Sequence, residues 1–338
     1  MPRPKSDRPG PRNCITDVPG LKVGCAVDEA ARTGVSVILP DRPAIVAGDV
    51  RGGGPGARET DLLKPSTMVD RADAIVLSGG SSYGLAAADG VTSWLGAKGR
   101  GFQLVPAPGV PPSPIVPAAI LYDLANGGDK TWNDKPPYAA LGRAAAEAAT
   151  NNDAPVRLGC TGAGIGARAG DGPGGLGAAS YVLDNDIIIG ALVAVNSFGS
   201  PYMPGTQAFW AWPYEIDGEF GGTRPPSHWH GARDFPADTK LGAPAPGQNT
   251  TIGTIAISAT LTQADAERIA IMAQDGLARA LRPVHGPTDG DILFVIATGQ
   301  ETPAPLDPLS LTRLGLVAAD CVARAIARGV FEATENAA

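Results

Sequence analysis

The chain has 338 residues, of which 43% are hydrophobic and 18% charged, and this composition excludes a disordered acidic chain and a coiled coil. Its 27 basic against 34 acidic residues give a net charge of −7 without a basic stripe, so we expect no nucleic-acid partner. No apolar run approaches the roughly 18 residues that suggest a membrane span, so we expect no membrane association either.

Residues 1–13 are rich in proline and arginine, which predicts a flexible tail ahead of a single domain over residues 14–338. This segment lacks the apolar stretch of a signal peptide. The four cysteines are widely spaced and form no C-x-x-C pair, a pattern typical of buried free thiols in a reducing compartment. We therefore expect a cytoplasmic protein.

Short apolar runs bounded by glycine and proline predict strands, and longer segments with one apolar face predict helices between them. In chain order the expected strands are Val35–Leu39, Ala74–Leu77, Phe102–Val105, Asp186–Val195, Thr250–Ser258 and Ile292–Ala297. The expected helices are Leu85–Leu95, Tyr138–Ala149, Ala264–Leu281 and Leu311–Ala327. Thr262, with Asp265 three residues later, is the expected N-cap of the third helix, and Asp307 before Pro308 that of the fourth.

The segment Ser200–Gln248 holds three of the five tryptophans and two of the three histidines. Its prolines exclude a central strand, so we expect a long exposed connection. The strand that follows places Ile255 and Ile257 on one face. An exposed linker is therefore expected to meet a core strand at Asn249–Thr250.

Gly80-Ser-Ser-Tyr-Gly84 fits the G-x-S-x-G nucleophile elbow between a strand and a helix. A Ser82 esterase would recruit an acid and a histidine downstream, for example His285. The alternative is a tight strand-to-helix turn.

Two further motifs have a functional and a structural interpretation. Gly159–Gly170 contains a G-x-G-x-x-A spacing, but no helix can begin at Asp171, so close backbone packing is favoured over a nucleotide site. His228-Trp-His230 offers two imidazoles without an evident third ligand, which favours surface histidines over a zinc site. We expect neither a cofactor nor a metal.

The Asn249–Thr250 junction supports a different chemistry. A threonine hydroxyl needs a base, and chain cleavage before Thr250 would supply one as the new α-amine. That amine titrates near 7.7–8.0 in model compounds, so a useful fraction is neutral at physiological pH. Taken alone, Thr-Thr at a strand start also fits simple β-propensity.

Six blocks of the sequence together resemble the DmpA-type family, which includes L-aminopeptidase/D-amidase-esterases, β-aminopeptidases and a nylon-oligomer endohydrolase. The blocks are Asn13–Gly24, Asp49–Asp61, Leu77–Leu85, Pro114–Asp123, Asn249–Gly253 and Arg282–Asp291. The resemblance implies an α+β fold, a four-layer αββα sandwich of the N-terminal-nucleophile (Ntn) hydrolase type. It also implies a precursor that cuts itself between Asn249 and Thr250 into chains 1–249 and 250–338, and tetramers of processed protomers.

The same resemblance implies residue roles. Thr250 matches the nucleophile, Asn196 an asparagine that helps hold the oxyanion, and Tyr122 a tyrosine lining the site. Asp289 and Asp291 match the pair that hydrogen-bonds around the nucleophile, although both also fit a turn before a strand. The implied activity is hydrolysis of small peptides, amino-acid amides or esters through an acyl-enzyme. Endo-type hydrolysis of linear oligoamides and a Ser82 esterase remain alternatives.

One position departs from the family pattern. Many relatives carry a lysine just after the glycine-rich run, where this chain has Asp171. A cation beside the site is therefore expected to be absent or supplied by another residue such as Arg168.

Overall fold

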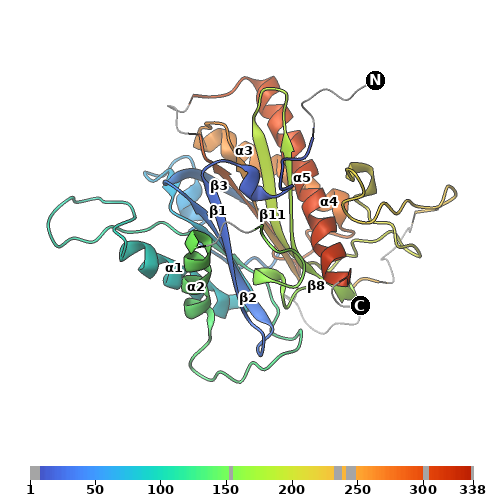
Figure 1. The fold of residues 1–338 in the computed structure, drawn as a ribbon, viewed down its shortest axis with the longest axis horizontal. Coiled ribbons are helices and arrows are strands. Elements are labelled where there is room, and N and C mark those ends of the chain that lie inside the picture. The colour runs from blue at the N-terminus through green and yellow to red at the C-terminus, as the bar shows by residue number, and fades with distance from the viewer. Residues whose placement is uncertain (1–7, 152–154, 232–237, 241–248, 300–303, 336–338) are drawn as a thin grey trace.

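Two β-sheets lie face to face, and helices cover the outer side of each (Figure 1). This computed structural model describes residues 8–151, 155–231, 238–240, 249–299 and 304–335. Its four layers are those of the αββα sandwich that the sequence predicts.

The larger sheet has six strands and carries the junction of interest. Its order is β10 (Gly175–Val182), β11 (Ile188–Asn196), β12 (Thr250–Ile257), β13 (Ile292–Ala297), β3 (Ala44–Val50) and β5 (Arg71–Ala72). The pair β12–β13 is parallel, and the other pairs are antiparallel.

The smaller sheet has five strands and faces the first across the middle of the molecule. Its order is β1 (Leu21–Asp28), β2 (Thr33–Pro40), β6 (Ile75–Ser78), β7 (Ala118–Ile120) and β4 (Ala57–Arg58). A separate hairpin joins β8 (Arg168–Ala169) to β9 (Gly172–Pro173).

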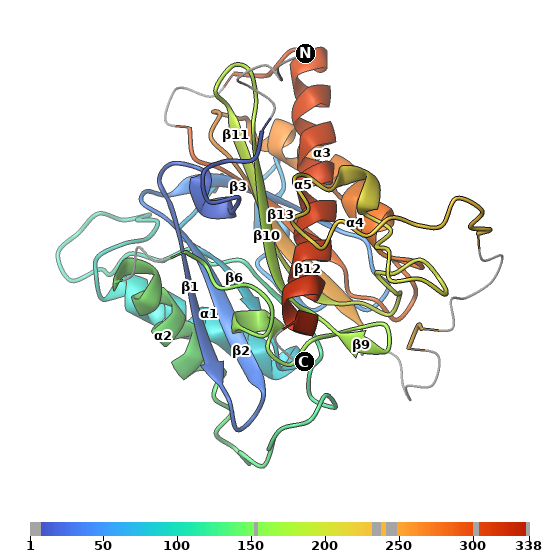
Figure 2. The same ribbon diagram turned by 45° about the vertical axis from the view of Figure 1, so that its right-hand side comes forward.

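Three apolar cores separate the layers. The helices α3 (Gln263–Ala273), α4 (Asp275–Ala280) and α5 (Pro308–Glu335) cover the six-stranded sheet, and α1 (Ala86–Gly96) and α2 (Tyr138–Asn151) cover the five-stranded one (Figure 2). The third core fills the space between the sheets. Short 3-10 helices are Ile15–Asp17, Asp61–Leu63, Ser81–Leu85, Gly162–Gly164 and Trp212–Tyr214.

Side chains of β12 alternate between two of these cores. Ile255 and Ile257 share one face, as predicted, and that face packs against the helices, whereas Ile252 and Ala256 face the space between the sheets. Because successive side chains of a strand point to opposite faces, Thr250 belongs to the set that faces the other sheet.

The predicted elements mostly form, and both predicted helix caps are confirmed. Thr262 Oγ1 accepts a hydrogen bond from the Asp265 amide at 3.1 Å, and Asp307 Oδ1 accepts two from the first turn of α5. The helix predicted over 264–281 is two helices, α3 and α4, which meet at Gln274.

The strand expected at Phe102–Val105 is wrong. Only Phe102 pairs, in a single bridge with Ser113, and Leu104 is 70% exposed. Its apolar side chains have no sheet to pack against, because the intervening chain forms a proline-rich loop.

The strands β1, β3 and β10 were not predicted, because they contain glycines that weaken the strand pattern. In β10, a Cβ on Gly177 would lie 1.9 Å from the Ala325 carbonyl oxygen, so the glycine lets α5 pack closely.

Two segments expected to be loose are packed where the structure describes them. In the connection, Met203, Phe209 and Phe220 are buried, the last two in the core beneath α5, so this part is not an exposed linker. Residues 8–13, expected in the tail, also make contacts: Arg8 bridges to Val182. Residues 1–7, 232–237 and 241–248 lie outside the described part.

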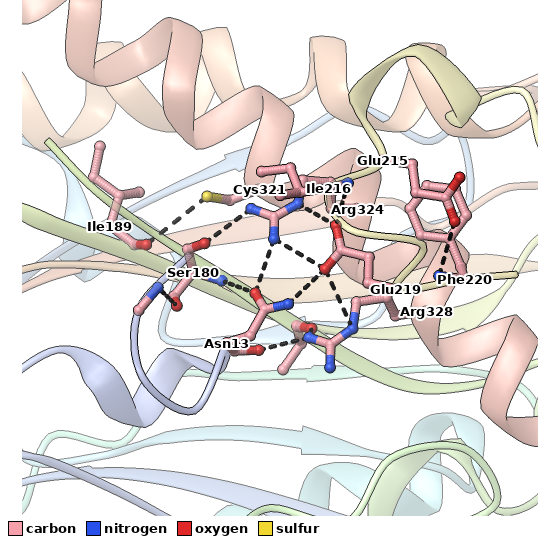
Figure 3. A network of polar contacts seen from close by, with 12 residues as sticks. Asn13, Ser180, Ile189, Glu215, Ile216, Glu219, Phe220, Cys321, Arg324 and Arg328 are labelled. Atoms are coloured by element: carbon pink, nitrogen blue, oxygen red, sulfur yellow. Dashed lines mark hydrogen bonds and ion pairs between the residues drawn. The ribbon is translucent and has the colours of Figure 1, made fainter. Parts of the chain in front are cut away.

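A buried polar network fixes residue Asn13 and the connection to α5 (Figure 3). Arg324, 1% exposed, binds both carboxylate oxygens of Glu219, at 2.5 and 2.9 Å. The same guanidinium donates to Asn13 Oδ1 at 2.9 Å and to the Ser180 carbonyl at 2.8 Å. Segments from both sides of Asn249–Thr250 are therefore held by one side chain.

Candidate active site

The Asn249–Thr250 junction is buried at the N-terminal end of β12, a central strand of the six-stranded sheet. Asn249 is 5% and Thr250 3% exposed, and Thr250 begins β12 opposite Asn196, the last residue of β11. Side chains directly opposite in an antiparallel pair lie on the same face, with Cβ atoms about 5 Å apart. The pairing register therefore brings the predicted oxyanion residue beside the predicted nucleophile.

The peptide carbonyl ahead of Thr250 is enclosed by two donors. Thr250 Oγ1 donates to the Asn249 carbonyl oxygen at 2.5 Å, and the Gly290 amide donates to the same oxygen at 2.9 Å. A Cβ on Gly290 would lie 2.7 Å from Thr250 Oγ1 and 2.8 Å from the Gly54 carbonyl oxygen. A larger residue fits here only if the hydroxyl or the backbone shifts, and the Gly290 amide holds the carbonyl that the hydroxyl would attack.

Three donors orient the Asn196 carboxamide. Its Oδ1 accepts from the Arg168 amide at 2.9 Å, from Asn126 Nδ2 at 3.2 Å and from Lys240 Nζ at 3.4 Å. Its Nδ2 donates to the Tyr122 carbonyl oxygen at 3.0 Å. With the oxygen side occupied by donors, the NH₂ side is the one turned toward the smaller sheet. Tyr122 therefore enters this arrangement through its backbone.

Asp289 and Asp291 are both 2% exposed and lie beside the junction. Asp291 accepts the Thr251 amide at 2.8 Å through Oδ1, and its Oδ2 lies 2.8 Å from His285 Nδ1. Asp289 accepts the Gly286 amide at 2.7 Å. Burial, together with the negative charge of Asp291, raises the pKa of Asp289 to about 6. Both carboxyls are therefore part of the site as well as of the turn before β13.

Lys240 is the residue that sequence reasoning missed. Its Nζ donates to the Asn196 carbonyl oxygen at 3.2 Å, and burial, with the nearby Arg168 charge, lowers its pKa to about 7. The Arg168 side chain is exposed and donates to the Asp171 carbonyl. A basic side chain is thus present beside Asn196, but it comes from the connection, where no sequence motif pointed to it.

Ser82 lacks the surroundings of a nucleophile elbow. The left-handed backbone positions are Gly80 and Ser81, and Ser82 is an exposed residue of the 3-10 helix that follows them. Among the described residues no hydrogen bond joins Ser82 to a histidine, and His285 is bound to Asp291. The strand-to-helix turn is the interpretation that these contacts support.

The other two motifs have structural surroundings. A Cβ on Gly162 would lie 2.3 Å from Ser36 Oγ, and one on Gly164 would lie 2.2 Å from the Leu176 amide nitrogen, so these glycines permit close packing. His228 and His230 are exposed, and between them Trp229 packs edge-to-face on Trp210. Over the described ranges, no group of three or more metal-ligating side chains is found. The helices described there include none long and apolar enough to cross a membrane.

The family model of peptidase family S58 matches residues 13–338. The chain belongs to this family. An uncharacterised aminopeptidase of Mycobacterium tuberculosis is 43% identical over 338 residues, covering 95% of this chain and 94% of that protein. A 6-aminohexanoate-oligomer endohydrolase of Kocuria sp. is 31% identical over 321 residues, covering 90% of this chain and 82% of that one. The S58 protein described here is therefore a peptide-bond hydrolase of the aminopeptidase and amidase type.

Solved structures show the same fold. The l-aminopeptidase d-ala-esterase/amidase from Ochrobactrum anthropi, described as a variant of the Ntn hydrolase fold, superposes with a TM-score of 0.70 at 21% identity, covering 98% of this chain and 89% of that chain. A Burkholderia sp. beta-aminopeptidase gives 0.69 at 24% identity, with 97% and 88% covered. The αββα sandwich is thus of the Ntn-hydrolase type.

Proposed function

We propose that this S58 peptidase is a self-processing amidohydrolase whose nucleophile is Thr250, freed by cleavage after Asn249. The observation that carries the proposal is the enclosed junction, where the Thr250 hydroxyl and the Gly290 amide meet at one peptide oxygen. A buried threonine held against its own preceding carbonyl is positioned for intramolecular attack.

Processing follows from these contacts. Thr250 Oγ1 loses its proton and bonds to the Asn249 carbonyl carbon, and the Gly290 amide stabilises the charge that develops on the oxygen. The carbon–nitrogen bond then breaks, the nitrogen takes up a proton, and an ester joins Asn249 to Thr250. Water hydrolyses this ester to the Asn249 carboxylate, the Thr250 hydroxyl and a free α-amine. Asp289 is the proposed proton acceptor in the uncut chain, because that amine does not yet exist.

Turnover uses the same hydroxyl on an external amide. The α-amine of Thr250 accepts the hydroxyl proton and later passes it to the leaving amine, and Asn196 Nδ2 donates to the tetrahedral oxyanion. Asp291 holds the Thr251 amide and so fixes the start of β12. The product acid leaves after water attacks the acyl-enzyme.

The proposed substrates are small peptides and amino-acid amides. The likeness to aminopeptidases at 43% identity supports this class. Endo-type cleavage of linear oligoamides is a second candidate, supported by the 31% identity to a 6-aminohexanoate-oligomer endohydrolase. Paired assays on an aminoacyl amide and on a blocked linear oligoamide separate the two. We also propose that the cut protomers assemble into a homotetramer, which native mass spectrometry tests.

Intact mass of the purified protein, beside Thr250→Ala, tests the nucleophile. We expect wild-type fragments 1–249 and 250–338, the smaller beginning Thr-Thr-Ile-Gly, and an uncut, inactive Thr250→Ala chain. An intact wild-type chain that still hydrolyses esters would refute the proposal and favour Ser82, which Ser82→Ala would then check. An intact and inert chain that hydroxyl-reactive inhibitors do not label would indicate a binding protein.

A further inference from the structure

Lys240 lies in a short stretch, residues 238–240, that is anchored at several points. The Asp238 carbonyl accepts the Asp171 amide at 3.0 Å, and the Ser200 hydroxyl donates to the Asp238 carboxylate. The Lys240 amide donates to the Phe198 carbonyl at 3.2 Å. The turn of the β8–β9 hairpin and the residues just after β11 therefore hold this stretch in place.

The Lys240 side chain is half-buried, and within the described ranges no carboxylate is in ion-pair contact with its Nζ. Nζ donates to the two oxygens of Asn196, the backbone oxygen at 3.2 Å and Oδ1 at 3.4 Å. Burying an amine is costly unless its hydrogen bonds are made in the interior. Both hydrogen bonds of Nζ go to Asn196, so polar contact with that one residue, rather than apolar packing, sets the place of the amine.

We propose that Lys240 is a positioning residue that fixes the Asn196 carboxamide with its NH₂ group toward the reacting carbonyl. This inference rests on the proposed function of Thr250 and Asn196. Lys240 reaches the backbone and the side-chain oxygen of the same residue, so it couples the carboxamide to the end of β11. Without it, Oδ1 keeps two donors, so the carboxamide retains its orientation but is held less firmly, and Nδ2 is displaced from the place where the oxyanion needs a donor.

The two reactions of this site use different donors, and the difference makes the inference testable. In the uncut chain the Gly290 amide holds the Asn249 carbonyl oxygen at 2.9 Å. For an external substrate, the proposed donor to the oxyanion is Asn196 Nδ2. Loss of Lys240 is therefore expected to leave chain cleavage intact while slowing turnover of the cut enzyme.

The experiment compares Lys240→Met, Lys240→Arg, Asn196→Ala and the Lys240→Met/Asn196→Ala double variant in the full chain. Lys64→Met is the matched control, because Lys64 is exposed and pairs with Asp61 at the surface. Thermal melting confirms folding, intact mass measures cleavage, and kcat and KM are measured on an aminoacyl amide. Thr250→Ala is run in parallel.

For Lys240→Met we expect complete cleavage, kcat lower by about 10- to 100-fold and KM changed much less, as for a displaced catalytic group. Lys240→Arg retains more kcat because it keeps donors. In the Asn196→Ala background the Lys240→Met loss disappears, since the two residues act as a unit.

Three results would overturn the inference: a folded Lys240→Met or Asn196→Ala chain that stays uncut, an unchanged kcat, or losses that multiply in the double variant. If Lys240→Met fails to fold, Lys240→Arg tests the inference instead. That variant must then cut itself like the wild type and lose less kcat than Asn196→Ala. Cleavage or activity in Thr250→Ala would instead reject the proposed function itself, so the two failures are distinguishable.

Discussion

Replacing Gly290 by alanine places a methyl group where the Thr250 hydroxyl lies. The new Cβ would be 2.7 Å from Thr250 Oγ1 and 2.8 Å from the Gly54 carbonyl oxygen. Gly290 does not have a positive φ, so alanine strains no backbone dihedral there. The substitution therefore tests the contacts of the new methyl group with the hydroxyl and with the Gly54–Pro55 backbone.

The size of the effect follows from these distances. An ordinary contact of a methyl group needs about 3.4 Å or more, so hydroxyl or backbone must move by roughly 0.7 Å. A displacement near 1 Å can cost about 10²-fold in rate when it misaligns reacting atoms. Overpacking of this kind typically costs about 1–3 kcal/mol of stability. We expect Gly290→Ala to fold and to cut itself about 100-fold more slowly.

The assay follows the fragment 250–338 by intact mass after synthesis or refolding. Gly172→Ala is the matched control, because its Cβ would meet nothing nearer than the Ala169 carbonyl oxygen at 3.8 Å and Gly172 has no positive φ. Cleavage of Gly290→Ala at the wild-type rate, in a chain that melts normally, would show that the hydroxyl is not held as the contacts indicate.

Four further outcomes are expected. Asn196→Ala should lower kcat by about 10²- to 10³-fold, the usual loss of one oxyanion donor, with folding intact in a thermal melt. Thr250→Ser should still be cut and Thr250→Ala should not, by N-terminal sequencing. Processing of the uncut chain should slow as the pH falls below about 6, because Asp289 takes up a proton, and this acid limb of the rate profile should be missing in Asp289→Asn. Arg324→Met leaves the buried Glu219 carboxylate with Arg328, at 3.5 Å, as its weaker cationic partner. The free energy of unfolding in urea, measured in an uncut Thr250→Ala background, should therefore fall by about 3–5 kcal/mol.

The sequence by itself determined the layers and the place of the junction. Apolar periodicity predicts α1, α2 and the strands β2, β6, β11 and β13 close to their observed bounds, because each buries one face or both in a core, whereas α5 runs eight residues beyond its predicted end at Ala327. The change from a proline-rich stretch to Thr250-Thr-Ile-Gly marks the start of β12 for the same reason. Family resemblance, carried by several short blocks, indicated the sandwich.

Tertiary structure alone decided which groups meet at that junction. Asn196 and Thr250 are far apart in the chain, and only the register of β11 on β12 sets them side by side. The Gly290 amide reaches the Asn249 carbonyl because residues 249 and 289 pair in a parallel bridge, and local sequence patterns do not encode that pairing. Lys240 comes from a connection without periodicity, and the hydrogen bonds around Asp238 bring its amine to Asn196. Local patterns report what each segment buries, whereas a reactive site depends on distances between segments, which only the packed chain fixes.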